Sequence, residues 1–311
     1  MLLRFRVAVP QTIPPPSASG YTRTTDHPLY WALYGAADAP PMVVLHGGPG
    51  AHHDYLLPQM LRLGEAGPLL FYDQRGGGRS RTESRDPVTW RSHVADLAAV
   101  AREFDVTPLT LVGYSWGGLL ALFYAVEAAR EELPTPHRLV LIDPAPVSRA
   151  FRDEYDAEYA RRQSAGEIHA MREQLASSGL RSEDPDAYRQ RAFELSVAGF
   201  FADPRMANDL TPFRVIGRVQ QSVWESLGDY DLVDTLPGVT APTLVVHGRQ
   251  DPIPLASSET AARALPDARL VVLENCGHVP YVEQPDALFA AIERFLAETA
   301  DILLLRHRYD R

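Results

Sequence analysis

Short apolar runs of strand-forming residues recur along the chain, and stretches of helical periodicity separate the later ones. Their nearly continuous apolar character is typical of strands buried on both faces. The runs are Leu29–Tyr34, Met42–Leu45, Leu69–Tyr72, Leu109–Val112, Leu139–Ile142, Thr243–Val246 and Leu270–Leu273. Apolar residues at helical spacing mark Val94–Phe104, Leu119–Ala129 and Ala287–Leu296. Strand alternating with helix predicts an α/β fold with a mostly parallel central sheet flanked by helices.

One long stretch between the fifth and sixth apolar runs, from about Val147 to Asp234, breaks the alternation. It is rich in Arg, Glu, Asp, Tyr and Phe, it has helical character, and it shows no clear buried strand. Prolines bound it on both sides. We therefore predict a core formed by residues 1–146 and 236–311, with residues 147–235 inserted as a helical cap over the sheet.

The composition excludes several classes of chemistry. Hydrophobic residues make up 45% and charged residues 23% of the 311 residues, enough apolar material for a sizeable core. All 30 basic residues are Arg, so Schiff-base chemistry and the phosphate loop that needs a Lys are excluded. The net charge of −10 and the lack of a basic run argue against a nucleic-acid partner. We expect no cofactor.

The cysteine count and the first residues bear on the compartment. A single cysteine, Cys276, cannot form an internal disulfide, so nothing requires an oxidising environment. Residues 3–9 have apolar side chains at every second position, with Arg4 and Arg6 between the first of them, which predicts a strand rather than a signal peptide. No run approaches the ~20 apolar residues of a membrane span. We expect a soluble, cytoplasmic protein with no membrane partner.

A candidate nucleophile lies in the stretch LVGYSWGGL at 111–119, where a buried strand ends, Gly-x-Ser-x-Gly follows and a helix begins. Ser115 has to occupy a tight turn so that its hydroxyl stands clear of the sheet, and the flanking glycines avoid collisions with neighbouring backbone. The helix that follows offers amide donors to a developing negative charge. The pentapeptide alone is a common chance match, but the strand before it and the helix after it favour a catalytic serine.

A serine nucleophile needs a base, and the base needs an orienting acid, in the chain order Ser, acid, His. Asp251 follows the strand Thr243–Val246, and His278 follows the last strand. Asp143 is a weaker alternative acid. His247 precedes the acid, which is the wrong order for the base, and both residues have an ordinary structural interpretation.

The histidine-rich loop HGGPGAHHDY at 46–55 raises three possibilities: a metal site, a phosphate loop or part of an oxyanion hole. It follows an early strand, where hydrolases of this kind place their second oxyanion donor. We therefore predict that the amides of Gly48 and Trp116 form the hole, with His46 orienting the loop. The adjacent His52 and His53 diverge on a regular backbone, so we expect no metal. The run DQRGGGRS at 73–80 is interpreted as a structural turn beside the site, pinned by Asp73 and its arginines.

Together these motifs resemble those of the proline iminopeptidases (prolyl aminopeptidases) of the α/β-hydrolase superfamily. The resemblance rests on HGGPG at 46–50, DQRGGGRS at 73–80, GYSWGG at 113–118, the Asp of GRQDP at 251 and GHVPYVEQP at 277–285. It covers the core on both sides of the insertion. It implies the α/β-hydrolase fold and release of an N-terminal residue, often proline, from short peptides through an acyl-enzyme.

The resemblance also implies a cap carboxylate that holds the free ammonium group of the substrate. Glu225 is similar to the acid of the family, and Glu194 is a second candidate. An exposed helical glutamate is the competing interpretation for Glu225. The chain departs from the family at Tyr114, where Gly or Ser is frequent, and just before Asp251, where some relatives place a second acid.

Three hypotheses follow for the activity. The first is a serine aminopeptidase that acts on small peptides or amides with a small or cyclic N-terminal residue. The second is an esterase, amidase or lactonase of a small molecule with the same triad, and the third is a non-catalytic member that binds a ligand beneath the cap. Epoxide or haloalkane hydrolysis is disfavoured because it needs an Asp at position 115.

Overall fold

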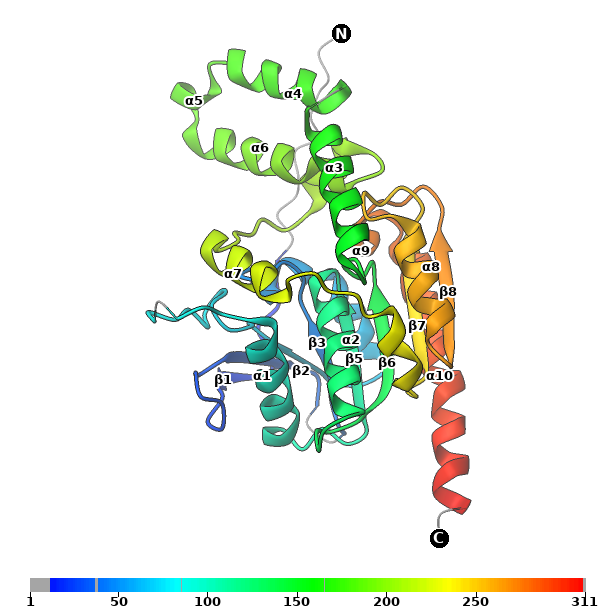
Figure 1. Ribbon diagram of the computed structural model, residues 1–311. Coiled ribbons are helices and arrows are strands. Elements are labelled where there is room, and N and C mark those ends of the chain that lie inside the picture. Colours follow the sequence, from blue (N-terminus) through cyan, green and yellow to red (C-terminus); the bar gives the residue numbers. More distant parts are fainter. Residues whose placement is uncertain (1–11, 37–38, 85, 165, 310–311) are drawn as a thin grey trace.

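The computed structural model describes residues 12–36, 39–84, 86–164 and 166–309, and it has a central sheet with a helical cap above one end (Figure 1). The predicted strand at residues 3–9 lies outside this part of the chain. Eight strands form the sheet in the order β1-β2-β4-β3-β5-β6-β7-β8. They are β1 Ala18–Tyr21, β2 Tyr30–Tyr34, β3 Met42–Leu45, β4 Leu69–Tyr72, β5 Leu109–Tyr114, β6 Pro136–Ile142, β7 Thr243–Gly248 and β8 Ala268–Leu273.

The sheet is mostly parallel, as predicted, because the pairs from β4 to β8 all run in the same direction. The two pairings made by β2, with β1 and with β4, are antiparallel. Seven of the strands coincide with the apolar runs. The sequence pattern did not indicate β1, because this strand at the edge of the sheet is largely exposed and carries no apolar signal.

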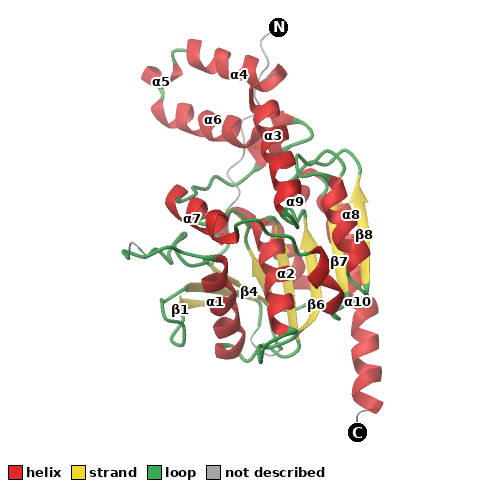
Figure 2. Cartoon of the chain, viewed as in Figure 1, coloured by secondary structure: helices red, strands yellow, loops and turns green. Residues whose placement is uncertain are grey.

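Helices cover both faces of the sheet (Figure 2). Alternate residues of β3 show why: Val43 and Leu45 pack into one apolar cluster, and Met42 and Val44 pack into the other. The first cluster includes residues of α1 Trp90–Glu103, α2 Trp116–Ala128 and α8 Leu255–Ala264, and the second includes residues of α10 Pro285–Tyr309. The short helices of the core are η1 His53–Leu56, η2 Gln59–Glu65, η5 Val233–Gly238 and α9 Pro280–Glu283.

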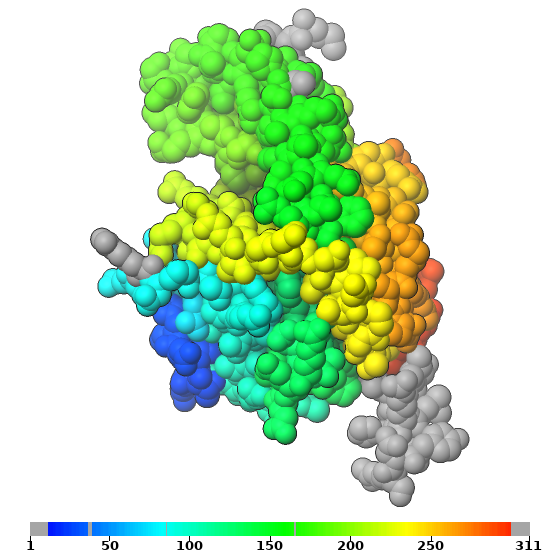
Figure 3. Space-filling model, viewed as in Figure 1, coloured from blue at the N-terminus to red at the C-terminus, as the bar shows by residue number. Residues whose placement is uncertain are grey.

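The cap is inserted between β6 and β7 and stands above the carboxyl ends of the parallel strands. It contains α3 Arg149–Ser164, α4 Gly166–Ser177, α5 Leu180–Glu183, α6 Pro185–Val197, η3 Ala198–Phe200, η4 Pro204–Asp209 and α7 Gly217–Leu227. The chain enters and leaves it side by side, since Arg149 N donates to Tyr230 O (2.8 Å) and Leu232 N donates to Val147 O (3.0 Å). A hollow separates the helices α4–α6, in green, from α7, in yellow (Figure 3).

No helix in the described part of the chain is long and apolar enough to cross a bilayer.

Candidate active site

Ser115 lies at the turn between β5 and α2, in a backbone conformation that few residues adopt. Its φ is 54° and its ψ is −119°. Neighbouring glycines make the turn possible: a Cβ on Gly113 would lie 2.4 Å from Gly117 O, and one on Gly117 would lie 2.2 Å from Leu45 O. The turn is closed by Ser115 N, which donates to Ile142 O (2.9 Å). The strained turn presents the hydroxyl at the carboxyl end of the sheet.

His278 and Asp251, from loops after two other strands, reach Ser115 in a continuous chain of hydrogen bonds. The loop after β8 brings His278 Nε2 to 2.9 Å from Ser115 Oγ. The loop after β7 brings Asp251 Oδ2 to 2.7 Å from His278 Nδ1. Because the carboxylate only accepts, Nδ1–H donates to it, and Nε2 is left to accept the serine proton. The structure thus brings the three predicted triad residues together.

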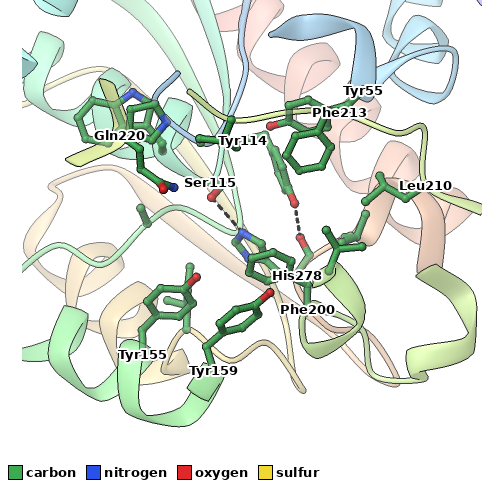
Figure 4. A pocket seen from close by; sticks show the side chains of 18 of the residues that line it. Tyr55, Tyr114, Ser115, Tyr155, Tyr159, Phe200, Leu210, Phe213, Gln220 and His278 are labelled. Carbon is green, nitrogen blue, oxygen red and sulfur yellow. Dashed lines mark hydrogen bonds between the residues drawn. The ribbon is translucent and has the colours of Figure 1, made fainter. Parts of the chain in front are cut away.

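The backbone of His278 is held on both sides. His278 N donates to Phe200 O of the cap (2.7 Å), and His278 O accepts a hydrogen bond from the Tyr114 hydroxyl (2.9 Å; Figure 4). Burial lowers the pKa of the imidazole to about 4, so His278 is neutral near pH 7 and able to accept a proton. Tyr114, which is a departure from the family pattern, therefore has a structural role beside the base.

The two alternative residues lie behind the triad rather than in it. His247 Nε2 donates to Ile253 O (3.1 Å), and its Nδ1 accepts from Ser258 Oγ (2.9 Å). Asp143 is fully buried and accepts a hydrogen bond from Gly248 N (2.8 Å). Neither is hydrogen-bonded to Ser115 or His278 among the described residues. Asp251 is the carboxylate that contacts the base.

The histidine-rich loop lies directly against the nucleophile. A Cβ on Gly47 would lie 2.8 Å from Ser115 Cβ, and Gly47 N is occupied because it donates to the Tyr55 hydroxyl (2.7 Å). Gly48, at φ 58°, and Trp116, the first residue of α2, both line the cavity above Ser115. Their amides have no acceptor within the described part of the chain, which leaves both available to an oxyanion.

His46 is tied to the second motif rather than to a ligand. Its Nε2 accepts from Gln74 N (3.0 Å), and its carbonyl accepts from the Gln74 side chain (2.8 Å). The same Gln74 side chain accepts from Trp116 Nε1 (2.8 Å), beside the oxyanion loop. Burial lowers the pKa of His46 to about 4, so this histidine stays neutral. Its position fits the predicted orienting role.

Asp73 pins the turn of the DQRGGGRS motif, where the sequence suggested it would. It accepts hydrogen bonds from His53 Nδ1 (2.6 Å), His53 N (3.0 Å) and Arg79 N (2.8 Å). Arg75 makes a two-pronged ion pair with Asp96, at 2.9 and 2.5 Å. His53, for which the sequence offered no role, is thus a partner of Asp73.

A cavity of about 420 Å³ lies between Ser115 and the cap. Most of its lining is aromatic or aliphatic. The cap supplies Arg152, Tyr155, Tyr159, Phe193, Ser196, Val197, Phe200, Leu210, Phe213, Val215, Gln220 and Trp224. Figure 4 shows Gln220, Tyr155 and Tyr159 on one side of Ser115, with Tyr55, Phe213 and Leu210 on the other. The cavity contains no Asp or Glu among the described residues that line it.

The structure does not bring the two predicted cap carboxylates to this cavity. Glu225 is exposed and accepts from Gln221 of its own helix (2.6 Å), while the preceding residue, Trp224, faces the cavity. Glu194 is buried, but it is bound to Arg191 (2.5 Å) and lines a separate cavity of about 220 Å³ within the cap. Adjacent helical residues point about 100° apart. Because Trp224 faces the cavity, the next residue, Glu225, points away from it.

The polar groups that the cap does present to the cavity were not predicted. Arg152 stacks on Trp224, with 3.8 Å between the guanidinium carbon and the ring centroid, and its Nε donates to the Asp156 carboxylate (2.9 Å). Its two terminal nitrogens make no hydrogen bond to any described residue. Gln220 lies one helical turn before Trp224 on α7. The helical spacing of Gln220 and Trp224 was the only sequence signal for this face.

Glu283 was also overlooked, although it belongs to the GHVPYVEQP motif. This buried carboxylate accepts from Gly277 N (2.9 Å) and Val279 N (3.2 Å) on either side of His278, and from Ala202 N of the cap (2.8 Å). It therefore links the loop that carries His278 to the cap. An acid a few residues after the catalytic histidine was the available signal.

The fold and this site define an enzyme class. Residues 42–292 match the family model described as the alpha/beta hydrolase family, and the chain belongs to this family of hydrolases.

The more specific similarity is to the proline iminopeptidases. The chain is 26% identical over 310 residues to the proline iminopeptidase of Saccharolobus solfataricus, covering 92% of this chain and 94% of the relative. The crystal structure of proline iminopeptidase from Mycobacterium smegmatis is similar, with 25% identity, a TM-score of 0.64, and coverage of 91% of this chain and 98% of that one. The fold is shared with a proline iminopeptidase-related protein from Thermus thermophilus, with 24% identity, a TM-score of 0.68, and 90% and 97% coverage. These similarities confirm the resemblance derived from the motifs.

Proposed function

We propose that the protein is a serine hydrolase that cleaves an amide or ester bond through an acyl-enzyme formed on Ser115. The observation that carries this proposal is the unbroken chain of hydrogen bonds from Ser115 through His278 to Asp251 at the base of the cavity. As Ser115 Oγ attacks the carbonyl carbon, His278 takes its proton and then gives it to the leaving amine or alcohol. Asp251 stays ionised and orients the imidazole.

The oxyanion of the tetrahedral intermediate lies between the Gly48 and Trp116 amides in this scheme. Both belong to preorganised elements, a glycine turn and a helix N-terminus, so no reorganisation is needed when charge develops. His278 then activates a water molecule, which attacks the acyl carbon, releases the acid and regenerates Ser115.

We further propose that the enzyme cleaves the bond after the N-terminal residue of a short peptide. Proline or another small apolar residue then forms the acyl group. The names of the similar proteins and the shared motifs support this assignment. The aromatic lining supports it as well, since an aromatic surface suits an apolar ring.

A second candidate, an esterase, amidase or lactonase, is favoured by one specific feature of the cavity. Arg152 is the charged side chain among its described lining residues, and no carboxylate accompanies it there. A substrate ammonium group would meet a like charge without a counter-ion. An acyl group that is neutral, or that bears a carboxylate, suits this polar end better.

A small substrate panel separates the candidates. We would measure Pro-p-nitroanilide, its N-acetyl derivative and p-nitrophenyl butyrate with the wild-type protein and Ser115→Ala. Turnover of the free amine but not of its acetylated form supports the aminopeptidase. Turnover of the acetylated form or the ester, without that of the free amine, supports the second candidate. If no substrate reacts and a fluorophosphonate fails to label Ser115, the protein is a ligand-binding member and the hydrolase proposal is wrong.

A further inference from the structure

Asp143 is a buried carboxyl group behind the triad to which the mechanism above gives no role. It follows β6 immediately and has a positive φ of 41°, a strained conformation for a residue with a side chain. Its backbone N donates to Val246 O (2.8 Å). The side chain is fully buried: Oδ1 accepts from Gly248 N, whereas Oδ2 has no hydrogen-bond donor among the described residues.

The neighbour of this carboxyl group is the triad acid. One ligand-type atom from each of Asp143, Asp251 and His247 lies within 4.8 Å of the other two, so the two carboxyl groups adjoin. Asp251 uses Oδ2 for His278 Nδ1 and Oδ1 for the amide of Ile253 (2.8 Å). Two carboxylates this close in a buried site cannot both be ionised, so the pair holds a proton.

The hydrogen bonds favour a proton on Asp143, because both oxygens of Asp251 accept from N–H donors whereas Asp143 Oδ2 does not. Burial raises the pKa of Asp143 well above its usual range, and the contact with Asp251 raises it further. Burial also raises the pKa of Asp251, but the neutral carboxyl group of Asp143 beside it acts in the opposite direction and lowers it. Asp143 is thus the neutral donor of the pair, and Asp251 is the group that ionises.

The other groups that face Asp143 do not replace this donor. His247 Nδ1 lies 3.8 Å from Asp143 Oδ1, but burial lowers the pKa of His247 to about 4, so it carries no positive charge. His278 is neutral for the same reason. The Cys276 thiol and the Tyr114 and Tyr281 hydroxyls are the remaining titratable neighbours, and burial raises the pKa of each. Both ring nitrogens of His247 already have partners, which argues against a metal ion between the three residues.

We propose that Asp143 is a positioning residue of the triad: its neutral carboxyl group donates a hydrogen bond to Asp251 and fixes that carboxylate against His278. This inference rests on the acyl-enzyme function proposed above. It extends the hydrogen-bonded chain to Ser115–His278–Asp251–Asp143. During the reaction the proton of Ser115 moves to His278, and Asp143 keeps its own.

The rate of Ser115 labelling by a fluorophosphonate tests this without knowledge of the substrate. Asp143→Asn keeps an N–H donor and should label within a few-fold of the wild-type rate at pH 7. Asp143→Ala leaves Asp251 without the donor and should label about 10- to 100-fold more slowly, the range that a hydrogen bond to a charged group is worth. Glu194→Ala, which removes a buried carboxyl group that does not line the active-site cavity, is the matched control and should label at the wild-type rate. Rates are taken per folded molecule, with circular dichroism to measure the folded fraction.

The pH profile adds a response that a purely structural role would not produce. In the wild type, labelling should fall as the pH drops towards 4, where His278 becomes protonated. It should fall again at alkaline pH, when Asp143 loses its proton and two charges adjoin. Asp143→Asn has no proton to lose there, so its alkaline limb should be absent.

A second measurement keeps the inference testable if the hydrolase proposal fails. The proton between His278 Nδ1 and Asp251 should give a downfield ¹H NMR resonance in the wild type and in Asp143→Asn, and lose or shift it in Asp143→Ala. An unlabelled wild type contradicts the proposed function, while the resonance still decides the role of Asp143. Wild-type behaviour of Asp143→Ala in both measurements overturns the inference. A dependence of the wild-type labelling rate on added Zn²⁺ or EDTA that Asp143→Asn abolishes also overturns it, in favour of a metal site.

Discussion

The two walls of the active-site cavity are built differently. The wall from the core consists of the loops after β3, β5, β6, β7 and β8, and its polar groups are fixed by hydrogen bonds from more than one loop. The wall from the cap consists of faces of α3, α6 and α7 with the segment between α6 and α7, and its lining is largely aromatic. Ser115 is held by a strained turn, whereas Gln220 extends from an ordinary helix (Figure 4).

This difference indicates that the core wall carries out the reaction and the cap wall selects the substrate. A polar group fixed by several buried hydrogen bonds cannot be moved or replaced without leaving partners unsatisfied. An aromatic helix face tolerates exchange of side chains, because its contacts are less directional. We therefore expect changes in the core wall to affect the reaction itself, and changes in the cap wall to affect which acyl group is accepted.

The largest expected effect is that of His278→Ala in the core wall. Without its base, the protein should lose at least about 10⁴-fold in kcat/KM, as triads generally do. Phe213→Ala in the cap wall is the comparison, and it should raise KM more than it lowers kcat. Steady-state kinetics on the best substrate of the panel measures both. Retention of more than about 1% of the activity by His278→Ala would contradict the division between a catalytic core wall and a selective cap wall.

The next effect concerns Glu283, which joins the two walls. Glu283→Ala leaves the amides of Ala202, Gly277 and Val279 without an acceptor, and the free energy of unfolding should fall by about 3 kcal/mol. Glu283→Gln retains one acceptor oxygen and should lose less. Urea unfolding followed by circular dichroism measures the difference. A loss below about 1 kcal/mol for the Ala variant would show that the walls are held together elsewhere.

Arg152→Gln should change the preference for acyl groups with a carboxylate over neutral ones by about tenfold. The effect is limited because the guanidinium is partly exposed and solvent screens its charge. We would compare the p-nitrophenyl monoester of succinate, which carries a carboxylate, with p-nitrophenyl butyrate, which does not. The ratio of their kcat/KM values should move towards butyrate. Arg149→Gln removes an exposed arginine paired with Asp153 on the same helix, and it should leave the ratio unchanged. An equal ratio in the two variants would remove Arg152 from substrate selection.

The smallest effect is expected at Glu225, on the outer face of α7. Because its side chain is exposed and bound to Gln221, Glu225→Gln should alter kcat/KM by less than about twofold for free-amine and ester substrates alike. A large loss confined to free-amine substrates would instead show that this carboxylate reaches the substrate ammonium group.

The same contrast explains how far the sequence could anticipate the structure. Ser115, Asp251 and His278 each follow a buried apolar strand, and the carboxyl ends of parallel strands meet at one edge of a sheet, so their convergence was predictable. No comparable rule applies to the cap. There the choice between Trp224 and Glu225 depends on how α7 is rotated about its axis, which its own sequence does not determine without the helix it packs against. The role of Glu283 was hidden because its partners are backbone amides, one of them in the cap.

The attachment of His278 to the cap has a consequence for how such enzymes diversify. The catalytic histidine donates its backbone N–H to Phe200 O, and a Cβ on Gly277 would lie 2.2 Å from that same oxygen. The cap therefore cannot be exchanged independently of the core. A graft from a homologue would have to carry a backbone of the same shape at residues 200–202, or the recipient would lose the geometry of its base along with its old substrate range. Gradual replacement of side chains on α3, α6 and α7 is the route to new substrates that leaves this connection intact.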